Sequence, residues 1–574
     1  MKKKILPVAI VILLILLLSG GLAGSYLIEK YTPTKEHEEL SDFYGLEGED
    51  RVAIILNQEV LETRGLLKDG SVYLDYDFVR ENLNPHFYWD SNEELLFYSL
   101  DRELLTITAD ASSYTQGISS CEFEETICFV ENGLPYISLK FIEEHSSFTA
   151  TCYNEPARLV ITTATIDVDT ARISKDTELR HKGGIKSPIL KDVKASEQVY
   201  VLAVDETWTK VLTEDGIPGY VKSNLLTAQS TATLTAGEEK ESFTHILMDE
   251  PVCLAWHQVT NQTANRNLEN VLASTKGINV ISPTWFYLND NEGNIADLGS
   301  IDYVTTCHSR GIKVWGLVSN LENSSVSTTT VLTHSSLRQN LVNQIIAAAI
   351  RYQLDGINVD FESLESEVGD GYIQFIRELS IKCANNDLCL SVDNYVPYPY
   401  TAFYNRSEQG LYADYVIIMG YDEHYNGSDS GSVASLGWVE NGVSNTLEEV
   451  DAGQTILGIP FYTRIWKLID KQADVTDSSD ESSIYDVSSA VYSMSGAAAA
   501  VEEAGAAASW DEESGQYYAE WTQDTITYRC WLEESESISR KLDLVDSYSL
   551  GGAAFWKLGF EDSSVWDTIS EKLK

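Results

Sequence analysis

The chain has 574 residues, of which 43% are hydrophobic and 10% aromatic, so it is long and apolar enough to bury several cores. Its formal net charge is −48. Because phosphate groups bind to basic surfaces, this charge excludes a nucleic-acid partner, and it excludes adhesion to anionic lipid through charge. A solvated acidic exterior accounts for the charge without any particular ligand.

The first residues differ from the rest of the chain. Three lysines at positions 2–4 precede an apolar run over 5–18, which continues weakly to Ile28. The run is long enough to cross a hydrocarbon layer of roughly 30 Å, and its basic flank favours the cytoplasmic side. We therefore predict a transmembrane anchor over residues 1–28, which places the rest of the chain on the extracytoplasmic face of the cell membrane. The alternative is a signal peptide cleaved near Leu22-Ala23-Gly24, which predicts a secreted protein.

Eight cysteines are compatible with export. Cys121 and Cys128 are close in sequence, as are Cys383 and Cys389, so either pair can form a disulfide; buried, reduced thiols are the alternative. No CxxC spacing and no cluster of cysteine and histidine indicates zinc, and we expect no metal or cofactor.

Changes in residue pattern divide the chain after the N-terminal segment. Short alternating segments predict β-rich structure first, and buried-looking strands that alternate with helical segments follow later. The predicted parts are a polar stalk over 29–48, a β-rich domain over 49–166, a small β-barrel over 167–227, a linker over 228–242 and a large domain over 243–574.

Two of these parts resemble modules of bacterial wall proteins. Leu74–Val79 and Ile137–Ile142 resemble a repeated element of copper-amine-oxidase-N-like stalk domains. Such domains carry no copper chemistry, so the resemblance implies binding or spacing. Trp208–Val211 and Gly216–Val221 resemble the end of a bacterial SH3-like barrel. That resemblance implies either the binding of cell-wall peptide or a spacer.

The large C-terminal part has the rhythm of a (β/α)₈ barrel, with strands and helical spacers alternating over about 330 residues. The helix before the fourth strand shows the expected period, with Leu337, Leu341, Ile345 and Ala349 on one face. The eight predicted strands are Cys253–Trp256, Ile278–Ile281, Ile312–Trp315, Gly356–Glu362, Leu388–Val392, Tyr415–Met419, Thr455–Ile459 and Gly552–Trp556.

The fourth strand carries the strongest chemical signal, in the segment Asp355–Glu362. Side chains alternate between the two faces of a strand, so Asn358, Asp360 and Glu362 face the barrel interior and step toward its C-terminal mouth. Burying three polar groups in this way is costly unless they are paired or used. The segment therefore predicts a functional carboxylate pair at the catalytic end of the barrel; a solvated strand end or a hard-cation site is the alternative.

This segment resembles the DxxDxDxE signature of glycoside hydrolase family 18, which contains chitinases and related enzymes. Further segments resemble later landmarks of the family, so the resemblance covers the whole barrel. These segments are Ile418–Asp422 for the sixth strand, Leu457–Tyr462 for the seventh and Gly551–Trp556 for the last.

The resemblance implies hydrolysis in which the substrate's own N-acetyl oxygen attacks the anomeric carbon, with overall retention. It implies that Glu362 donates the proton, that Asp360 orients the acetamido group, and that Tyr421 bonds the acetamido oxygen. The implied substrate contacts are Asn358, Met419, Asp422, Trp556, Trp285 and Tyr462. For Tyr421 and Trp556, ordinary packing in the barrel is the alternative.

One residue departs from the family pattern, because Asn358 stands where most chitinases have an aspartate. The change makes one partner of Asp360 neutral, puts the usual shared proton in doubt and predicts a shifted pH profile. Together with Val280–Phe286 on the second strand, it resembles the spore-cortex-lytic branch, which acts on N-acetylglucosamine linkages of peptidoglycan. The anchor and wall modules agree with that branch.

A long insert over 466–531 separates the seventh and eighth strands, and its stretch from 472 to 528 contains no lysine or arginine. Alanine runs over 497–500 and 506–508 predict helix, with Gly505 between them. The insert resembles the small α+β insertion that forms one wall of the cleft in this family. A solvated excursion is the alternative.

The sequence thus predicts an enzyme that cleaves N-acetylglucosamine-containing wall glycan. A chitinase or endo-acting hydrolase on foreign polysaccharide is one alternative. A catalytically silent glycan-binding protein on the same barrel is another, although such proteins typically lack the glutamate that is Glu362 here.

Overall fold

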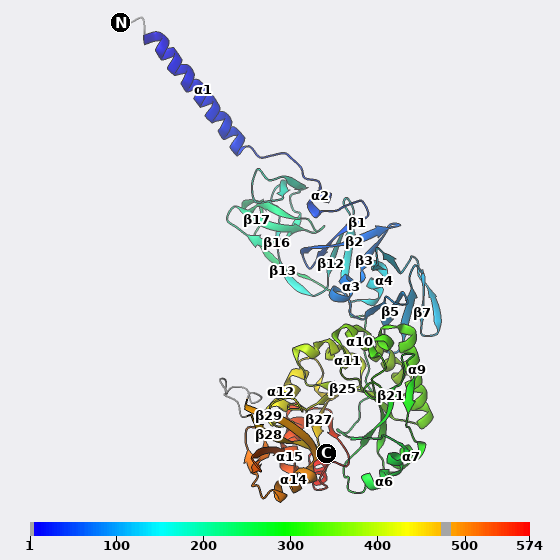
Figure 1. The fold of residues 1–574 in the computed structure, drawn as a ribbon. Coiled ribbons are helices and arrows are strands. Elements are labelled where there is room, and N and C mark those ends of the chain that lie inside the picture. Colours follow the sequence, from blue (N-terminus) through cyan, green and yellow to red (C-terminus); the bar gives the residue numbers. More distant parts are fainter. Residues whose placement is uncertain (1–4, 472–483, 574) are drawn as a thin grey trace. The chain divides into compact units, whose positions relative to one another are not determined.

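The structure, a computed structural model, describes residues 5–471 and 484–573 (Figure 1). These residues form two compact units. One unit contains the chain up to residue 87 together with 107–114 and 120–241, and the other contains 88–106, 115–119 and the chain from 242 onward.

The first unit begins with helix α1 (Ile5–Tyr31), which Figure 1 shows as a long single helix. Its segment Ala9–Tyr31 has 23 residues and a mean hydropathy of 2.3, so its length and composition are sufficient to cross a membrane. A signal sequence has the same properties. The predicted basic flank at positions 2–4 lies outside the described residues.

Two seven-stranded sheets make up most of the first unit, whose β-rich character the sequence predicted. The first has the order β11-β12-β1-β2-β3-β10-β9, and the second has the order β15-β14-β18-β17-β16-β13-β19. The strands of the first sheet are β1 (Arg51–Leu56), β2 (Glu59–Lys68), β3 (Ser71–Asp75), β9 (Cys128–Glu131), β10 (Leu134–Ser138), β11 (Thr149–Tyr153) and β12 (Arg158–Thr162). Those of the second are β13 (Ile166–Arg172), β14 (Thr177–Arg180), β15 (Ile189–Val193), β16 (Gln198–Val204), β17 (Trp208–Thr213), β18 (Pro218–Lys222) and β19 (Ser230–Leu234).

The helical turns of this unit are short. The two similar segments of the sequence both form the end of a strand and the start of a helix: Asp75 caps α3 (Tyr76–Asn82) and Ser138 caps α4 (Leu139–His145). The other helices are α2 (Leu40–Tyr44) and η1 (Ser223–Leu225). Strand β19 lies within the predicted linker and pairs with β13 over five residues. Part of that linker is therefore a strand, since backbone pairing needs no apolar period.

A smaller five-stranded sheet has the order β4-β5-β6-β7-β8. Its strands are β4 (Phe87–Asp90), β5 (Leu95–Ser99), β6 (Leu104–Thr108), β7 (Ser113–Gln116) and β8 (Ser119–Glu122). Residues 88–106 pack against the barrel helices: the buried Arg338 guanidinium lies over the ring of Tyr88 at 4.9 Å and bonds Glu378 at 2.8 Å. A fragment that starts at residue 243 lacks this packing, so experiments on the barrel need the full chain.

The second unit contains a closed barrel of eight parallel strands in the order β20-β33-β27-β26-β25-β24-β23-β21, with β21 pairing to β20. The predicted barrel is therefore confirmed. Its strands are β20 (Val252–His257), β21 (Val280–Leu288), β23 (Lys313–Ser319), β24 (Gly356–Asp360), β25 (Cys389–Tyr395), β26 (Tyr415–Met419), β27 (Thr455–Pro460) and β33 (Gly552–Trp556). The short strand β22 (Ile295–Asp297) extends the sheet beside β21.

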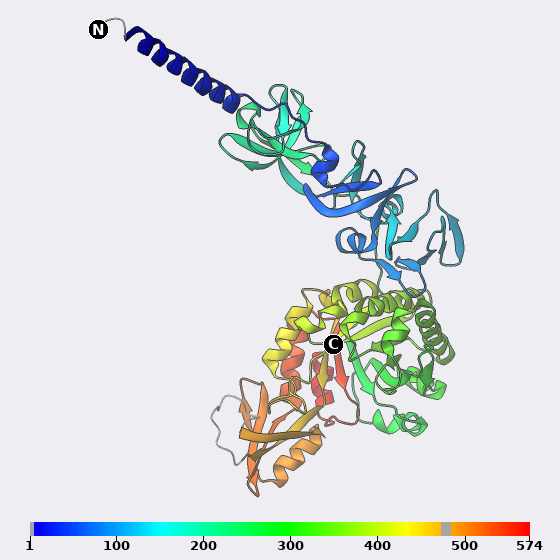
Figure 2. The ribbon, with the colours of Figure 1, turned by 45° about the horizontal axis from the view of Figure 1, so that its top comes forward.

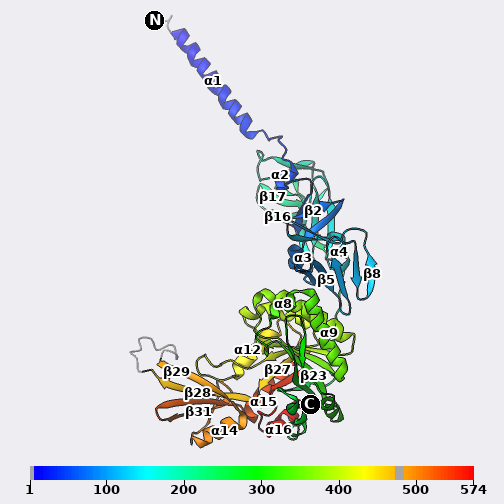
Figure 3. The same ribbon diagram turned by 45° about the vertical axis from the view of Figure 1, so that its right-hand side comes forward.

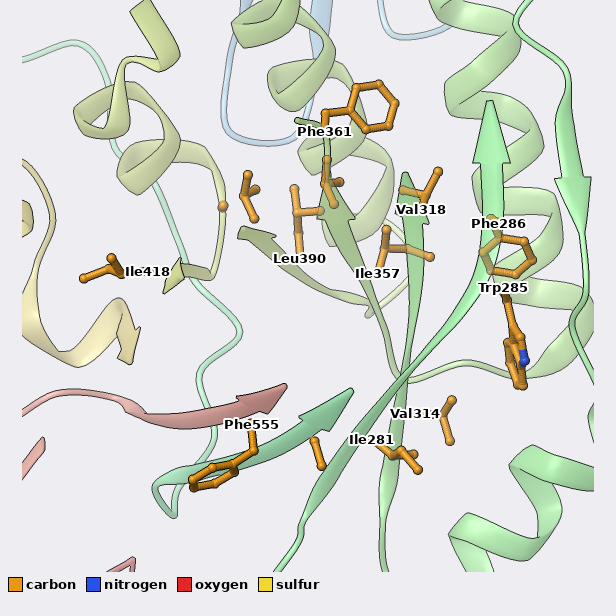
Figure 4. Packing of buried hydrophobic residues seen from close by; sticks show 14 of the residues in the cluster. Ile281, Trp285, Phe286, Val314, Val318, Ile357, Phe361, Leu390, Ile418 and Phe555 are labelled. Carbon is orange, nitrogen blue, oxygen red and sulfur yellow. The ribbon is translucent and has the colours of Figure 1, made fainter. Parts of the chain in front are cut away.

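Helices surround the barrel. They are α5 (Gln262–Arg266), α6 (Leu268–Val271), α7 (Ile301–Ser309), α8 (Thr328–Thr333), α9 (Ser335–Tyr352), α10 (Gly369–Ala384), α11 (Arg406–Tyr412), α12 (Leu436–Thr446), α15 (Ser535–Tyr548) and α16 (Val565–Lys572), with short turns η2 (Ser366–Val368), η3 (Pro399–Tyr404) and η4 (Ala452–Gln454). The predicted face of α9 is buried at Leu341, Ile345 and Ala349. Figure 4 shows Ile357 of β24, and Phe361 directly after that strand, in the apolar layer between strands and helices.

An insert between β27 and β33 forms its own five-stranded sheet, β29-β28-β32-β31-β30, and helix α14 (Met494–Glu503) packs beside it (Figures 2 and 3). Its elements are β28 (Tyr462–Asp470), β29 (Tyr485–Ser493), α14 (Met494–Glu503), β30 (Ser509–Asp511), β31 (Gln516–Gln523) and β32 (Ile526–Leu532). The first alanine run lies in α14. The second does not continue the helix, because Gly505 adopts a left-handed conformation with φ of 64°.

All eight cysteines are free thiols in the structure, and both pairs considered for disulfides remain unpaired. Six are buried, among them Cys128, Cys383 and Cys389.

Barrel closure depends on Gly552, where β33 meets β20. Its φ is 151°, and an added Cβ would lie 2.1 Å from the backbone oxygen of Val252. We expect Gly552→Ala to destabilise the protein by about 3 kcal/mol or more, because the clash is with backbone on a neighbouring strand. Calorimetric unfolding measures the effect. Gly453→Ala is the control, since its Cβ would meet no atom within 4 Å, and equal stability of the two variants would contradict the prediction.

Candidate active site

Strand β24 divides its side chains between two environments. Ile357, Val359 and Phe361 are buried in the outer apolar layer, and Asn358 lies in the barrel interior with none of its surface exposed. The strand ends at Asp360, and Glu362 follows it.

Two hydrogen bonds with one side chain fix the backbone of Glu362. Asn320 donates from Nδ2 to the carbonyl oxygen of Glu362 at 2.9 Å, and its Oδ1 accepts from the backbone N–H of Glu362 at 2.8 Å. The backbone that carries the carboxyl group is therefore anchored at the mouth of the barrel.

A cavity of about 210 Å³ lies at this mouth. It has aromatic walls and a group of acidic side chains, and it is close to the size of one sugar residue. Its lining residues are Trp256, Asp360, Glu362, Asp393, Tyr395, Met419, Tyr421, Asp422, Tyr462 and Trp556.

The carboxyl group of Glu362 holds its proton more strongly than an ordinary glutamate. Burial raises its pKa, the charges of Asp422 and Glu322 raise it further, and a hydrogen bond from Tyr395 acts in the opposite direction. The net pKa lies above the usual value of 4.5. Glu362 is thus poised as a proton donor.

The surroundings of Asp360 oppose ionisation of its carboxyl group even more strongly. Its pKa is raised well above 3.8 by burial, and then by the nearby carboxylates Asp393, Glu362 and Glu322. Within the described part of the chain, Oδ1 of Asp360 is buried and has no hydrogen-bond partner. An acceptor oxygen of this kind, in a cavity wall, is available to a donor on a bound molecule.

Three side chains hold Asn358 in one orientation. Its Oδ1 accepts from Trp256 Nε1 at 2.9 Å and from Ser282 Oγ at 3.0 Å. Its Nδ2 donates to Oδ1 of Asp393 at 2.8 Å. Asn358 is thus below the cavity rather than in its lining, so it supports the site without reaching a ligand directly.

The sixth and seventh strands supply the opposite wall. Met419 ends β26 with 8% of its surface exposed, and Tyr421 follows it. Burial and the surrounding carboxylates raise the pKa of Tyr421 well above 10, so its hydroxyl stays a donor. Tyr462 donates to Oδ1 of Asp422 at 2.6 Å, which fixes that carboxylate at the rim.

Trp556 ends the last strand and lies partly exposed in the cavity wall. Its ring packs edge-on against Trp256, with ring centroids 5.9 Å apart. This contact fixes the plane of the indole, which can then serve as a stacking surface for a sugar ring.

Trp285 lies elsewhere, which corrects the sequence-based expectation that it contacts substrate. It is completely buried, and its Nε1 donates to Oδ1 of Asn265 at 2.8 Å. Figure 4 shows Trp285 and Phe286 on the side of β21 that faces the helices. The pairing of β21 with β23 shifts between Thr284 and Phe286, and this irregularity breaks the simple alternation.

The sequence reasoning missed three lining residues: Trp256, Asp393 and Tyr395. Side-chain alternation along β25 could have indicated Asp393 and Tyr395, because they lie with Ser391 on one face of an extended strand. The predicted strand ended at Val392, so the last two fell outside it.

A second cavity of about 640 Å³ shares Tyr395, Met419, Tyr421 and Asp422 with the first, so the two are adjacent. Its outer wall is aromatic. Tyr398 and Tyr400 stack with ring centroids 5.3 Å apart, and Tyr400 is 74% exposed. Such exposed rings beside a catalytic cavity suit further sugar residues of a chain.

Over residues 5–471 and 484–573, no group of three or more histidine, cysteine, aspartate or glutamate side chains is arranged to hold a metal ion.

The chain is similar to known proteins over about half of its length. The chain is 24% identical over 310 residues to the uncharacterized glycosylase YvbX of Bacillus subtilis (strain 168), covering 52% of this chain and 85% of that protein. It is 24% identical over 272 residues to the cortical fragment-lytic enzyme of the same organism, covering 45% of this chain and 59% of the enzyme. Among solved structures, the C-terminal domain of a candidate chitinase from Desulfitobacterium hafniense DCB-2 shares the fold, with a TM-score of 0.51, 17% identity, and coverage of 57% of this chain and all of that domain.

The sequence profile of the family described as glycosyl hydrolases family 18 matches residues 255–561, which is more than half of the chain. The match spans the barrel, the acidic cavity and the insert. The chain therefore belongs to glycosyl hydrolases family 18 and is a glycoside hydrolase.

Proposed function

We propose that the protein is an extracytoplasmic hydrolase of N-acetylglucosamine-containing cell-wall glycan, and that it acts by substrate-assisted, retaining hydrolysis. The observation that carries the proposal is the cavity of about 210 Å³ in which Glu362, with its raised pKa, lies with Asp360, Tyr421 and Trp556. The similarity to a cortical fragment-lytic enzyme supports a wall glycan as the substrate.

In the proposed mechanism, Trp556 stacks on the sugar whose linkage is cleaved. Glu362 donates its proton to the glycosidic oxygen as the bond to the anomeric carbon breaks. The acetamido oxygen of the same sugar attacks the anomeric carbon and forms a cyclic oxazolinium ion, so the second carboxylate need not be a nucleophile. The deprotonated Glu362 then takes a proton from water, and this water attacks the anomeric carbon from the face that the leaving group left, which opens the ion with retention.

The acetamido group needs donors and acceptors in fixed positions. Oδ1 of Asp360 is the proposed acceptor for the acetamido N–H, and its negative charge stabilises the positive charge that develops on the ring. The hydroxyl of Tyr421 is the proposed donor to the acetamido oxygen. Asp422, held by Tyr462, and Met419 complete the wall that confines the group.

The N-terminal unit fits a role in placing this barrel at the wall. We propose that α1 anchors the chain in the membrane or directs its export. We also propose that residues 49–166 are a copper-amine-oxidase-N-like stalk domain and 167–227 an SH3-like domain, and that both bind or space the chain from cell-wall material.

Digestion assays test the substrate. Full-length protein in detergent micelles is incubated with purified peptidoglycan and, separately, with chitin oligosaccharides, and products are identified by mass spectrometry. Fragments that end in reducing N-acetylglucosamine from peptidoglycan support the proposal. Cleavage of chitin oligosaccharides alone favours a chitinase on foreign polysaccharide, and glycan binding without cleavage of either favours a silent binding protein.

Variants of the two cavities test how the glycan is held. We expect Trp556→Ala to lower kcat/KM about 10-fold or more on every substrate, because it removes the stacking surface where the bond is cut. Tyr400→Ala is expected to weaken only longer oligosaccharides, since Tyr400 borders the outer cavity. Steady-state kinetics over a series of chain lengths measures both, and an identical dependence on length would contradict the assignment.

A further inference from the structure

Asn358 stands at a position of the signature segment where most chitinases have an aspartate, so β24 lacks a second carboxylate beside Asp360. An amide at this position cannot share a proton with Asp360. The structure supplies another carboxylate on the neighbouring strand, in Asp393, to which neither the sequence reasoning nor the proposed mechanism gives a role.

The register of the two strands places Asp393 beside Asp360. Asn358 of β24 lies opposite Ser391 of β25, and Val359 lies opposite Val392. One residue further along each strand are Asp360 and Asp393, whose side chains face the same cavity. Asp393 is only 3% exposed, so its carboxyl group sits in the barrel interior.

Asn358 connects Asp393 to the rest of the site. Its amide has a fixed direction, since Trp256 and Ser282 both donate to Oδ1. The Nδ2 group is therefore turned toward Asp393, to which it donates at 2.8 Å. This bond orients the Asp393 carboxyl group but contributes no positive charge.

Two buried carboxyl groups in this relation cannot both ionise at low cost. The charged side chains that act on Asp360 are themselves carboxylates, with Asp393 the first among them. The pair therefore resists full ionisation, and each member is coupled to Glu362, whose charge raises the pKa of both.

We propose that Asp393 is a positioning residue of the hydrolytic site: with Asp360 it forms the proton-sharing acidic pair of the barrel interior, and it thereby favours the acid form of Glu362. The position of the second carboxylate has moved from β24 to β25, and Asn358 has become the amide that orients it. This inference rests on the proposed function.

Other titratable groups around the pair are also carboxyl or phenol groups. Those on β24 and the loops nearby are Glu362, Glu322 and Asp422, and those on surrounding elements are Tyr372, Tyr395, Tyr404 and Tyr421. Of the charged members, Glu362 and Glu322 repel a further negative charge, so they raise the pKa of Asp360, as Asp393 does.

Stability measurements test the pair without reference to catalysis. Burial raises the pKa of Asp360 and Asp393 above 3.8, and repulsion adds to it, from Asp393 and Glu362 on Asp360 and from Glu362 on Asp393. The folded state therefore binds their protons more tightly than the unfolded state does. The stability this gives is complete at low pH and is lost as pH rises through the raised values. Asp393→Asn removes one such group. We expect its Tm relative to wild type to rise by about 2 °C or more between about pH 4 and about pH 8.

A difference in Tm that stays constant with pH would overturn the inference, because a merely structural contact does not titrate. The variant keeps a partner for Asn358, since the new amide oxygen accepts from Nδ2, and folding is therefore expected to survive.

Kinetics of Asp393→Asn, and of a double variant that exchanges the residue types at 358 and 393, test the effect of the pair on the acid form of Glu362. Asp393 and Glu362 interact, since the charge of Glu362 raises the pKa of Asp393. In Asp393→Asn this like charge beside Glu362 is removed, so the basic limb of the kcat/KM profile is expected to move down by about one pH unit. The double variant Asn358→Asp with Asp393→Asn places a carboxylate at position 358, next to Asp360. The new amide at position 393 can then donate a hydrogen bond to the carboxylate at position 358. We expect it to restore the basic limb to within about 0.3 pH unit of wild type.

A folded swap variant whose profile stays with that of Asp393→Asn would contradict the proposal. Wild-type protein that hydrolyses no glycan would instead refute the proposed function and, with it, the positioning role of Asp393; the dependence of Tm on pH would then decide only whether Asp360 and Asp393 form an acidic pair.

Discussion

The Glu362→Gln variant is expected to lose about 10³-fold in kcat on any glycan that the wild type cleaves, because an amide cannot donate a proton to the glycosidic oxygen. Its Tm should stay close to that of wild type, since the two bonds from Asn320 hold the backbone and not the carboxyl group. Binding of a glycan, measured by calorimetry, should also persist. Retained turnover in this variant would remove Glu362 from its proposed role.

A neighbouring glutamate provides the matched control. Glu365 lies on the exposed surface three residues further along the chain. The same substitution, Glu365→Gln, should leave kcat unchanged. A similar loss in both variants would indicate that the loop after β24 is disturbed and that the chemistry of Glu362 was not tested.

The Asp360→Asn variant should have the next largest effect, with kcat lowered about 10²-fold, because the amide carries no charge to stabilise the positive ring. The basic limb of the pH profile should also move to lower pH. Asp360 and Glu362 interact, since the charge of Glu362 raises the pKa of Asp360. Removing the Asp360 carboxylate removes a like charge beside Glu362, so the acid form of Glu362 is expected to be lost earlier as pH rises. Rates measured across the pH range, on wild type and variant, check both expectations.

Asp355 offers a contrast within the same signature. Its carboxyl group accepts from the backbone N–H of Val314 at 2.8 Å, and it lies 2.8 Å from Nε2 of His308 at the other end of the strand. Asp355→Asn should therefore lower stability and leave the pH profile in place. A shift of the profile equal to that of Asp360→Asn would contradict the division of roles between the two aspartates.

The barrel was predictable because its information is local. Each strand is a short apolar run, each helix has a buried face with a period near 3.6, and eight repeats in order define the closed sheet. The placement of Asp360 and Glu362 on the inner face followed from alternation along one strand. Helix α14 followed from its alanine run, and Gly505 limited it.

Features that depend on pairing between distant segments were not predictable in this way. The partnership of Asp393 with Asp360 requires the register of β24 against β25, which one sequence does not state. Trp285 was misplaced because the pairing of β21 with β23 shifts just at that residue. Strand β19 has no apolar pattern of its own, and β13 alone gives it a partner.

The most direct test of the proposed mechanism is whether cleavage depends on the N-acetyl group of the glycan, since the substrate itself is proposed to supply the nucleophile. Glycan strands prepared from peptidoglycan are compared before and after chemical removal of their N-acetyl groups, and NMR follows the anomer first formed by the full-length protein. We expect that only the acetylated strands are cleaved and that the new reducing ends appear as the β anomer. Equal cleavage of the deacetylated strands, or first appearance of the α anomer, would contradict it.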